Sequence, residues 1–568
     1  MDSTTLTAQG PSFLGGTSRA AAILSALLAA ALMVIVATVP IRSDNDCWWH
    51  VKSGQLILEG LAAGEGLPKT DPFSFTAADL EWHNHEWLTQ AAMALVFNAG
   101  EATSLGGWRA VILATTLVLA ACTLVLWALA GRLSGNWWIA LLVAALAVAI
   151  GRRTYYPRPP VPSNLLLAGL LCLLIAVAQG KLRPRWLLVL PPVFALWTNL
   201  HGAWMAGIVV LAAFLAGDVL ARLRLVPLPL EAPPAPLRPL HAALLLGAVL
   251  LATLCNPYGW RLYELPARVL SDRELVASIG ELQPPNLNFT RIFETLLLAI
   301  IAGALFARRL RVRFAELAIF VFFLHQGLQH VRHLLLFSVM MVPLVSRLFG
   351  SLLEQAREAL GSAFPGEAAR VQRALGGATL ALALSVCGLT LANWPLTGDS
   401  YPRRFASYWQ TPEGYLKDSF PAALCDFVEL AGLEGRMFNE NHYGGYLIWR
   451  LSPGTHKVFS DPRFDIFGGT IWREEAQVAG GVEFPGQPAS SWHGILDRWD
   501  VQWAIVGRGS GLHQRLLEEG AGWVLVADFS TPRQRTMPGG GRQVWIRDTP
   551  TNAAQVERAR RTFAASFG

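Results

Sequence analysis

The chain is poor in charge and lacks motifs that pair cysteines or bind nucleotides. Only 15% of its 568 residues are charged and 53% are hydrophobic, whereas a soluble domain has roughly 25% charged residues. The six cysteines show no CxxC spacing, which argues against a disulfide framework or a zinc knuckle. No GxGxxG or P-loop opens a helix, and the 46 Lys and Arg against 40 Asp and Glu form no long run. Nucleotide and nucleic-acid binding are therefore not expected, and the composition predicts a polytopic α-helical membrane protein.

Apolar runs long enough to cross about 30 Å of hydrocarbon, some of them short, recur along the first two thirds of the chain. They lie near residues 20–40, 108–130, 137–150, 164–178, 186–197, 204–220, 241–254, 295–307, 315–324, 334–348 and 374–392. The first run has no small-residue cleavage site after it, so we interpret it as a retained helix. The pattern predicts about eleven spans, within a membrane domain that covers residues 1–395.

Lys and Arg in short loops predict the orientation. If the N-terminus is cytoplasmic, the cytoplasmic loops carry a basic set: Arg132, 181–185, 221–224, 307–313 and Arg347. An odd number of spans then places residues 396–568 and a large first loop, 42–107, outside the cytoplasm. We predict a multi-pass protein of the inner (plasma) membrane.

One predicted outer loop carries several basic residues, although the basic set otherwise lies in the cytoplasmic loops. Residues 151–164, "GRRTYYPRPPVPSN", fall outside by span parity yet contain Arg152, Arg153 and Arg158. Guanidinium groups bind phosphate bidentately, so an anionic head group at the outer surface would explain them. The alternative is that one short span is miscounted and the loop is cytoplasmic.

The other predicted outer loops collect acids, amides and histidines. They hold Asp44, Asp46, His50, Asp71, His83, His85, Glu86, Asn199, His201, Glu281, His325, His330, Arg332 and His333. Ionisable groups near membrane depth are costly and usually functional. An acid at a helix exit can deprotonate an acceptor or hold a metal, and Arg and His can neutralise a phosphate leaving group. Structural interpretations stay open, because Asp44 also suits a helix cap and Asp71, before Pro72, suits a turn.

Composition becomes mixed after about residue 393. Candidate strands "RMFNE", "HKVFSD", "QWAIVG", "GWVLVAD" and "RQVWIRD" alternate with helical stretches "PAALCDFVELAG", "YGGYLIWRL", "WHGILDRWD" and "LHQRLLEEG". This alternation predicts a three-layer α/β domain over residues 396–568. In "FSDPRFD", Asp461, Arg463 and Asp465 either face an acceptor or form a turn held by an Asp–Arg pair.

Several motifs together carry a family resemblance over most of the chain. They are "DNDCWWHVKSGQLILEG", "LPKTDPFSFTAADLEWHNHEWLTQ", "LWTNLHGAW", "LCNPYGWRLYE", "VRHLLLF", "FNENHYGGYLIW" and "KVFSDPRFDIFGG". With them the chain resembles a bacterial family of multi-span proteins grouped with the GT-C-type glycosyltransferases, which include protein mannosyltransferases and oligosaccharyltransferases. The resemblance implies a polyprenyl-phosphate-linked sugar donor, inverting transfer on the outer face and an essential acid in the first outer loop. Asn45 separates the two candidate acids, Asp44 and Asp46, so they are not adjacent. The sequence also has no "WWD" signature. The acceptor class therefore stays open.

The sequence therefore predicts a cell-envelope glycosyltransferase whose partners are membrane lipid and a polyprenyl-phosphate-linked sugar. The predicted catalytic group is Asp46, Asp44, Glu281, His85 and Glu86. The predicted substrate-binding group is Arg152, Arg153, Arg158, Asn199, His201, Arg332 and His333. Cofactors stay unknown, with a divalent metal ion as one option. The alternatives are a transporter or flippase of a lipid-linked precursor and a non-catalytic envelope assembly protein.

Overall fold

The computed structural model describes residues 12–38, 44–226, 230–286, 291–308, 310–392, 401–410, 421–518, 522–530 and 541–567. Its backbone packs into two compact units, and neither is continuous in sequence. The helical unit comprises Met1–Pro40, Gly100–Gly259 and Ile279–Gln410, and the mixed unit comprises Ile41–Ala99, Trp260–Ser278 and Thr411–Gly568. The predicted domains divide the chain once, near residue 395, whereas the packing groups the first loop with the tail.

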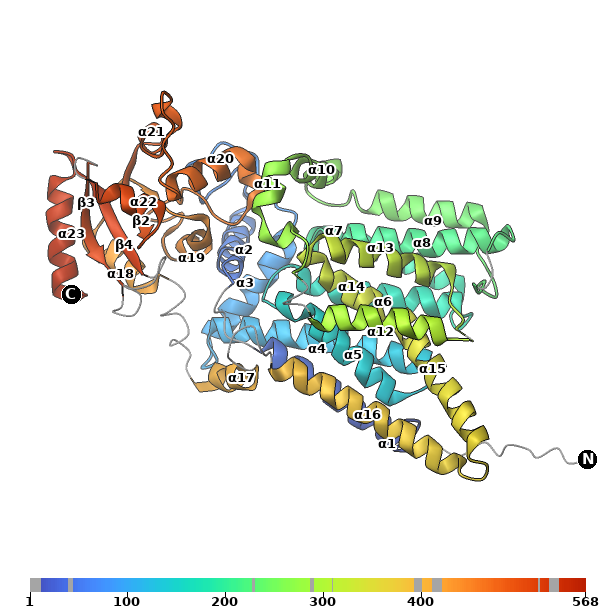
Figure 1. The fold of residues 1–568 in the computed structure, drawn as a ribbon. Coiled ribbons are helices and arrows are strands. Elements are labelled where there is room, and N and C mark those ends of the chain that lie inside the picture. Colours follow the sequence, from blue (N-terminus) through green and yellow to red (C-terminus); the bar gives the residue numbers. More distant parts are fainter. Residues whose placement is uncertain are drawn as a thin grey trace, which may run out of the picture. The chain divides into compact units, whose positions relative to one another are not determined.

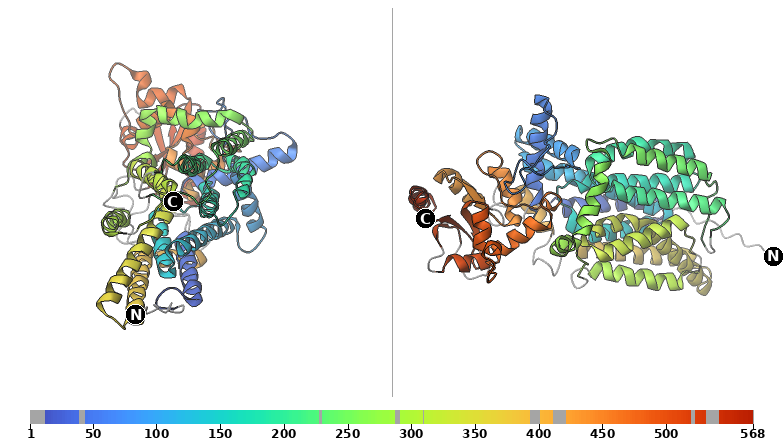
Figure 2. Two further views of the ribbon diagram at one scale, coloured as in Figure 1. Left: turned by 90° about the vertical axis from the view of Figure 1, so that its right-hand side faces the viewer. Right: turned by 90° about the horizontal axis from the view of Figure 1, so that it is seen from above.

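Helices that run roughly side by side build the helical unit (Figures 1 and 2). Its α-helices are α1 (Arg19–Ala37), α4 (Gly107–Ser134), α5 (Trp137–Gly151), α6 (Pro160–Ala178), α7 (Leu190–Leu200), α8 (Trp204–Arg222), α9 (Pro239–Ala252), α12 (Arg291–Phe306), α13 (Phe314–Gln329), α14 (Leu334–Met340), α15 (Val342–Ala363), α16 (Ala368–Ala392) and α17 (Tyr401–Gln410). Short 3-10 turns join them at η1 (Arg152–Thr154), η2 (Pro184–Val189), η4 (Gly280–Leu282) and η5 (Val331–His333).

Five helices of the described chain are long and apolar enough to cross a membrane, namely α1, α4, α6, α8 and α16. A sixth span arises if the segments Val331–Met340 and Val342–Ala363, which meet at a 52° bend, count as one. Each of the eleven predicted apolar runs falls on helical structure, but the count of about eleven spans is not confirmed. The chain is a multi-pass membrane protein.

Helix α5 illustrates why an apolar run does not by itself establish a full span. It has 15 residues, a length of about 22 Å at 1.5 Å per residue, which is short of a bilayer core of about 30 Å. Trp138 and the thirteen residues after it are all buried, and α5 packs against α1, α4 and α16. A helix that is apolar on every side is a core helix of the unit.

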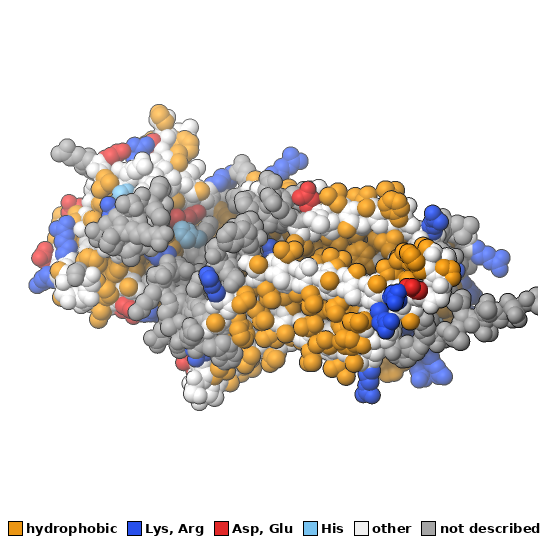
Figure 3. All heavy atoms as spheres, turned by 60° about the horizontal axis from the view of Figure 1, so that its bottom comes forward, with side chains coloured by type: hydrophobic (Ala, Val, Ile, Leu, Met, Phe, Trp, Pro, Cys, Tyr) orange, Lys and Arg blue, Asp and Glu red, His pale blue; other side chains and the backbone are white. Residues whose placement is uncertain are grey.

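The exposed flank of the helical unit is apolar. Figure 3 shows hydrophobic side chains covering this flank, with Lys and Arg side chains towards the end of the helices. The exposed apolar side chains include Leu298, Ile301, Leu305, Phe306, Leu382 and Leu389. An apolar surface of this extent is what a lipid-facing surface requires.

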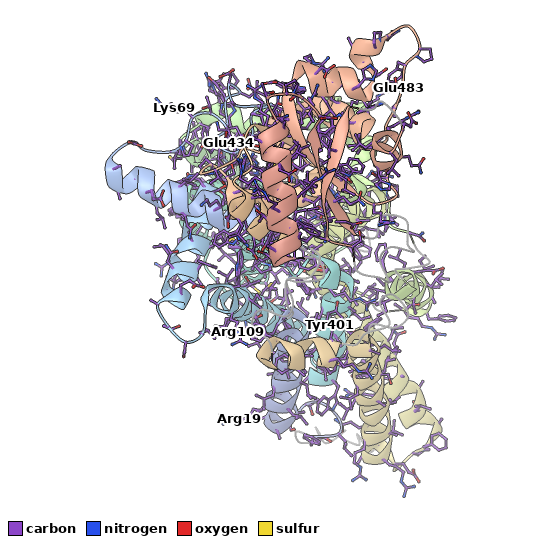
Figure 4. All side chains as sticks on the ribbon, turned by 90° about the vertical axis from the view of Figure 1, so that its left-hand side faces the viewer. Arg19, Lys69, Arg109, Tyr401, Glu434 and Glu483 are labelled. Carbon is purple, nitrogen blue, oxygen red and sulfur yellow. The ribbon has the colours of Figure 1, made fainter. Side chains whose placement is uncertain are left out.

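The short helix α17 is tied to the start of α4. The Tyr408 hydroxyl donates to the Arg109 carbonyl (2.7 Å), and the Arg109 guanidinium lies 6.0 Å from the centre of the Tyr408 ring. Figure 4 labels Arg109 and Tyr401, the first residue of α17. These contacts fasten the last helix of the helical unit to its helical bundle.

A four-stranded sheet forms one part of the mixed unit, in the order β1-β2-β4-β3. The strands are β1 (Arg436–Phe438), β2 (Val501–Gly507), β3 (Trp523–Asp528) and β4 (Arg542–Arg547). β1 pairs with β2 in parallel, whereas β4 is antiparallel to both β2 and β3. β2 is buried at six of its seven positions, and successive side chains of a strand point to opposite faces. Both faces of the sheet are therefore covered.

Helices make up much of the rest of the mixed unit. They are α2 (Asp46–Ala63), α3 (Trp87–Glu101, whose last two residues belong to the helical unit), α10 (Glu264–Ser271), α11 (Arg273–Ser278), α18 (Ala422–Ala431), α19 (Asn441–Leu451), α20 (Phe464–Ala479), α21 (Trp492–Arg498), α22 (Gly511–Leu516) and α23 (Ala553–Ser566), with 3-10 turns η3 (Gly259–Tyr263) and η6 (Pro488–Ser490). α23 packs against β3 and α18, while α21 and α22 pack against β2. The amide N–H of Glu434, labelled in Figure 4, donates to Gln555 Oε1 on α23 (2.9 Å).

Four of the five predicted strands are present, and helices occupy the four predicted helical stretches. The strand predicted at "HKVFSD" is wrong. The Val458 N–H donates to the Phe73 carbonyl (2.9 Å), and the Phe75 N–H donates to the Val458 carbonyl (3.2 Å). The backbone of Val458 therefore forms its hydrogen bonds with the first loop, and the segment adds no strand to the sheet.

A buried ion cluster joins the first loop to the tail. The Arg463 guanidinium donates to both carboxylate oxygens of Asp461 (2.8 and 2.6 Å) and to Asp71 Oδ1 (2.7 Å). All three side chains have essentially no exposure. Burial by itself lowers the pKa of Arg463, but the charges and hydrogen bonds of Asp461 and Asp71 outweigh it and raise that pKa.

Both turn predictions at this cluster are confirmed. Asp71 accepts the Phe73 N–H (3.1 Å) and the Ser74 N–H (3.1 Å), as a turn-forming Asp does. Asp461 accepts the Arg463 N–H (3.0 Å) as well as its guanidinium, so the "FSDPRFD" turn is held by an Asp–Arg pair.

Candidate functional site

Two candidate acids stand where the chain enters α2. Asp44 is fully buried, and its Oδ1 accepts the Asp46 N–H (3.2 Å), which closes the turn before the helix. Asp46 is the first residue of α2 and is partly exposed. The first turn of a helix stabilises a carboxylate through its unpaired N–H groups and its dipole. Asp46 is thus the more accessible acid, while Asp44 shapes the turn.

Glu86 lies between two imidazoles next to this turn. His50 is one helical turn after Asp46 on α2, so the two share a helix face. His50 Nδ1 lies 3.7 Å from Glu86 Oε2, and His85 Nε2 lies 3.6 Å from Glu86 Oε1. Two of the predicted catalytic residues, His85 and Glu86, are therefore in contact with each other and grouped around the buried His50.

Two amide side chains that the sequence analysis missed orient His50. Asn84 Nδ2 donates to Gln90 Oε1 (2.7 Å), which directs Gln90 Nε2 at His50 Nδ1 (3.2 Å). An amide nitrogen is only a donor, so Nδ1 accepts and the neutral imidazole carries its proton on Nε2. Gly54 permits the approach of α3, since a Cβ there would lie 2.0 Å from the Gln90 carbonyl oxygen. The i, i+4 spacing of Glu86 and Gln90 was the available sequence signal.

In the helical unit, a basic residue of the 151–164 loop meets an acid from a distant loop. Arg158 Nη1 lies 3.2 Å from Glu281 Oε1, and the Glu281 side chain is 55% exposed. Arg158 also lies over the Tyr156 ring, 5.7 Å from its centre. Glu281, predicted as a catalytic residue, is thus the ion-pair partner of a predicted phosphate-binding residue.

The turn that carries Glu281 packs beside the "QHVRH" segment. His330 Nδ1 lies 2.6 Å from the Leu282 carbonyl oxygen, which can only accept, so the proton of a neutral His330 is on Nδ1. The rings of His330 and His333 meet edge to face at 5.0 Å. In sequence, Arg332 stands between these two histidines and belongs to η5.

His201 and Asn199 are held by hydrogen bonds within the helical unit. His201 Nδ1 accepts the Ala203 N–H (3.1 Å) and lies 3.2 Å from Ser163 Oγ, which in turn accepts from Trp197 Nε1 (2.8 Å). The neutral His201 ring therefore carries its proton on Nε2. Asn199 Nδ2 donates to the carbonyls of Ala195 and Cys255 (both 2.8 Å), so it braces two loops. Ser163 was not predicted.

The predicted residues thus fall into two groups, one in each unit. Asp44, Asp46, His85 and Glu86 belong to the mixed unit, and Arg152, Arg158, Asn199, His201, Glu281, Arg332 and His333 belong to the helical unit. The side chain of Arg153 lies outside the described residues. The joining of both groups in one active site stays a prediction.

The described part of the chain contains no set of side chains arranged to bind a metal ion. Among those residues, no group of three or more His, Cys, Asp or Glu side chains is placed to hold an ion. The trio of His50, His85 and Glu86 is linked only by contacts of 3.6 to 3.7 Å, longer than the hydrogen bonds around it.

The arrangement of helices defines a class of fold before any relative is considered, a multi-pass helical unit combined with a mixed α/β unit. Comparison with solved structures finds similar folds. The Archaeoglobus fulgidus oligosaccharyltransferase tethered with an acceptor peptide is similar over 86% of this chain and 69% of its own, with a TM-score of 0.50 and 12% identity. Its apo form is similar over 85% of this chain and 69% of its own, with a TM-score of 0.50 and 13% identity. ArnT from Cupriavidus metallidurans bound to undecaprenyl phosphate aligns with 93% of this chain and 98% of its own, with a TM-score of 0.45 and 15% identity.

These structural neighbours are GT-C glycosyltransferases, the group whose resemblance the sequence motifs carry. At 12 to 13% identity the likeness to the oligosaccharyltransferase shows the fold alone. No protein-family model matches the chain, and no curated protein matches it. The fold of the chain is therefore of the GT-C type.

Proposed function

We propose that the chain is a membrane glycosyltransferase that moves a sugar from a polyprenyl-phosphate-linked donor to an acceptor on the outer face of the inner membrane. The observation that carries the proposal is the fold shared with an oligosaccharyltransferase over 86% of the chain. A partly exposed acid, Asp46, in the first turn of the helix that follows the first apolar helix adds chemical support. The transporter and the assembly protein are less favoured, because this neighbour is a transferase.

The proposed reaction needs one base. Asp46 takes the proton from an O–H or N–H group of the acceptor, and that acceptor atom forms a bond to the anomeric carbon of the sugar. The bond between the anomeric carbon and the phosphate oxygen breaks, and the lipid phosphate leaves with the electron pair. Asp44 holds the turn of the base through its hydrogen bond to the Asp46 N–H (3.2 Å).

Charge on the leaving phosphate is proposed to be met by the basic residues of the helical unit. The proposed set is Arg152, Arg153, Arg158, Arg332 and His333, with Asn199 and His201 as further polar contacts. Arg158 already holds one anionic group, Glu281, at 3.2 Å, and a donor phosphate competes for the same guanidinium. Glu281 thus acts as a placeholder that the donor displaces.

The mixed unit is proposed to supply the surroundings of the base. Glu86 lies between His50 and His85, and His50 shares a helix face with Asp46. We propose that these polar groups set the electrostatic surroundings of Asp46 during proton transfer. A divalent cation stays an open addition at this point, and the assay below includes arms with and without one.

The test uses purified protein in lipid nanodiscs with a panel of radiolabelled polyprenyl-phosphate sugars. A transferase releases free lipid phosphate and places the label on an acceptor, or on water at a slow rate. A second arm reconstitutes the protein in vesicles and measures movement of intact donor between leaflets. Turnover without movement supports the proposal. A donor that binds and crosses the bilayer, yet is never cleaved with any acceptor or divalent cation, overturns it in favour of a flippase.

A further inference from the structure

Two neighbouring glycines of the tail helix α19 are closed in by backbone on both sides. A Cβ on Gly445 would lie 1.8 Å from the Asn45 carbonyl oxygen, and a Cβ on Gly444 would lie 2.4 Å from the Ser460 carbonyl oxygen. Ordinary van der Waals contact begins at 3.4 Å. Both glycines are helical, so they are needed for space and not for an unusual backbone conformation. Backbone atoms cannot rotate away, so any side chain here forces the segments apart.

The segment against Gly445 is the turn that carries the candidate base. Asn45 stands between Asp44 and Asp46 and is the residue just before α2. Trp48, in the first turn of α2, is almost fully buried against Tyr446 (ring centres 4.9 Å apart, edge to face) and Trp449 (6.5 Å). Tyr446 and Trp449 are three residues apart on α19, so they lie on one helix face. The acid-bearing turn is therefore seated on α19.

The segment against Gly444 leads to the buried ion cluster. A Cβ on Gly444 would also lie 2.6 Å from the Asp461 Cα, and the Asp461 carboxylate holds Arg463. Arg463 in turn binds Asp71 near the middle of the first loop (2.7 Å). Residues 444–463 of the tail thus contact both turns of the first loop, the one at 44–46 and the one at 71–74.

We propose that Gly445 is a positioning residue, through which the tail helix α19 sets the place of the candidate base Asp46. This inference rests on the proposed function, because only there is Asp46 a base. A misplacement of about 1 Å can reduce a rate by about a hundredfold when orientation matters. The tail of the chain then affects the chemistry through the position of Asp46, because the turn that carries this acid is packed on α19.

The first experiment needs no substitution and no substrate. Hydrogen–deuterium exchange of the full chain in nanodiscs is followed in peptides covering residues 44–50 and 443–449, across increasing mild denaturant. If α19 seats the turn, the two peptides share one opening free energy and one denaturant dependence. If residues 44–50 open at lower denaturant while 443–449 stay protected, the inference is overturned.

The second experiment is kinetic and uses a matched glycine. In Gly445→Ala we expect kcat to fall at least tenfold while the KM for the donor changes less than twofold, because the proposed donor-binding residues lie in the helical unit. In the control Gly454→Ala a Cβ meets its nearest atom, the Leu451 carbonyl oxygen, at 3.9 Å, so both constants should stay as in the wild type. The number of donor-binding sites, titrated in the same samples, corrects kcat for the amount of folded enzyme. A merely structural role would lower the number of sites and leave kcat per site at the wild-type value.

A third variant covers the case in which Gly445→Ala does not fold. Asn45→Gly adds no atom and loosens the turn, so it should fold and lose severalfold in kcat at an unchanged donor KM. Wild-type kcat in either variant overturns the positioning role. Joint opening of the two peptides in a protein that never cleaves a donor overturns the proposed function instead, so the two failures are distinguishable.

Discussion

The Arg463 guanidinium binds the carboxylate of Asp71 at 2.7 Å across 392 positions of sequence, with neither side chain exposed to solvent. Through this pair the loop after the first apolar helix and the last third of the chain form one compact unit. The candidate base lies at one end of that loop, so its position depends on the tail.

Removal of Arg463 should destabilise the mixed unit strongly. Arg463→Met leaves Asp71 and Asp461 facing each other without a counter-charge, which should lower the free energy of opening by about 3 to 5 kcal/mol. Hydrogen exchange should show lost protection in residues 70–76 and 456–465 while α5 stays protected. The exposed Arg370, paired with Glu367, serves as control, and Arg370→Met should change little. Equal loss in both variants would contradict a special role for the buried cluster.

Glu475 should make the mixed unit less stable as pH rises. Burial, and then the nearby Glu440, raise the pKa of Glu475 to about 7, although the Asn441 N–H donates to its Oε1 (3.1 Å). The folded state therefore holds the proton more tightly than the unfolded state. This contribution is complete below the unfolded pKa of about 4.3 and is lost as pH rises through 7, a difference on the order of 3 kcal/mol.

The variant Glu475→Gln keeps the oxygen that accepts from Asn441 but does not titrate. It should match the wild type near pH 4 and exceed its stability at pH 8, as measured by exchange-derived opening free energies in the mixed unit. The exposed Glu518, paired with Arg515, offers a control in Glu518→Gln. If the stability of Glu475→Gln fell with pH as steeply as that of the wild type, another group would be the cause of the pH dependence.

Arg158 and Glu281 should have opposite effects on donor binding. Arg158→Ala should weaken binding of a polyprenyl phosphate roughly tenfold, about 1.4 kcal/mol, because a charge-assisted phosphate contact is lost. Glu281→Gln should strengthen binding severalfold, since the competing carboxylate is gone. The control Arg261→Ala removes a more exposed arginine that pairs with Glu81 in the mixed unit. Weaker binding in Glu281→Gln would contradict the placeholder role.

His201 should tolerate glutamine better than asparagine if its Nε2 contacts substrate. Asn places an oxygen near the Nδ1 position and keeps the acceptor for the Ala203 N–H (3.1 Å), whereas the longer Gln places a donor nearer to Nε2. His201→Asn should therefore fold normally and lose at least tenfold in kcat/KM for the donor, with partial recovery in His201→Gln. Full activity of His201→Asn would show that His201 only holds the loop.

Local features of the sequence predicted local structure well. Every long apolar run is helical, and the turns at Asp71 and Asp461 follow from side-chain oxygens that accept nearby N–H groups. The number of spans was not predictable in this way, because the apolar run of α5 looks like a span yet forms a core helix of 15 residues. Apolarity does not distinguish a lipid contact from a protein contact.

Contacts between distant segments could not be predicted. Turn chemistry suggested Asp71 and Arg463 separately, but nothing local says that they pair. The strand predicted at "HKVFSD" failed for the same reason, since its partner is the first loop and not the sheet. The glycines of "HYGGYLIW" were visible, yet their need for space appears only when Asn45 and Ser460 are placed against them.

The most direct test of the account compares Asp46→Asn and Asp44→Asn with the wild type in nanodiscs, scoring cleavage of the radiolabelled donor and its binding in parallel. The account predicts that Asp46→Asn folds and binds donor but loses about 10² to 10⁴ in kcat. Asp44→Asn should lose less, because its side-chain oxygen still accepts the Asp46 N–H. Donor cleavage by Asp46→Asn at the wild-type rate would contradict the central claim that this acid is the base.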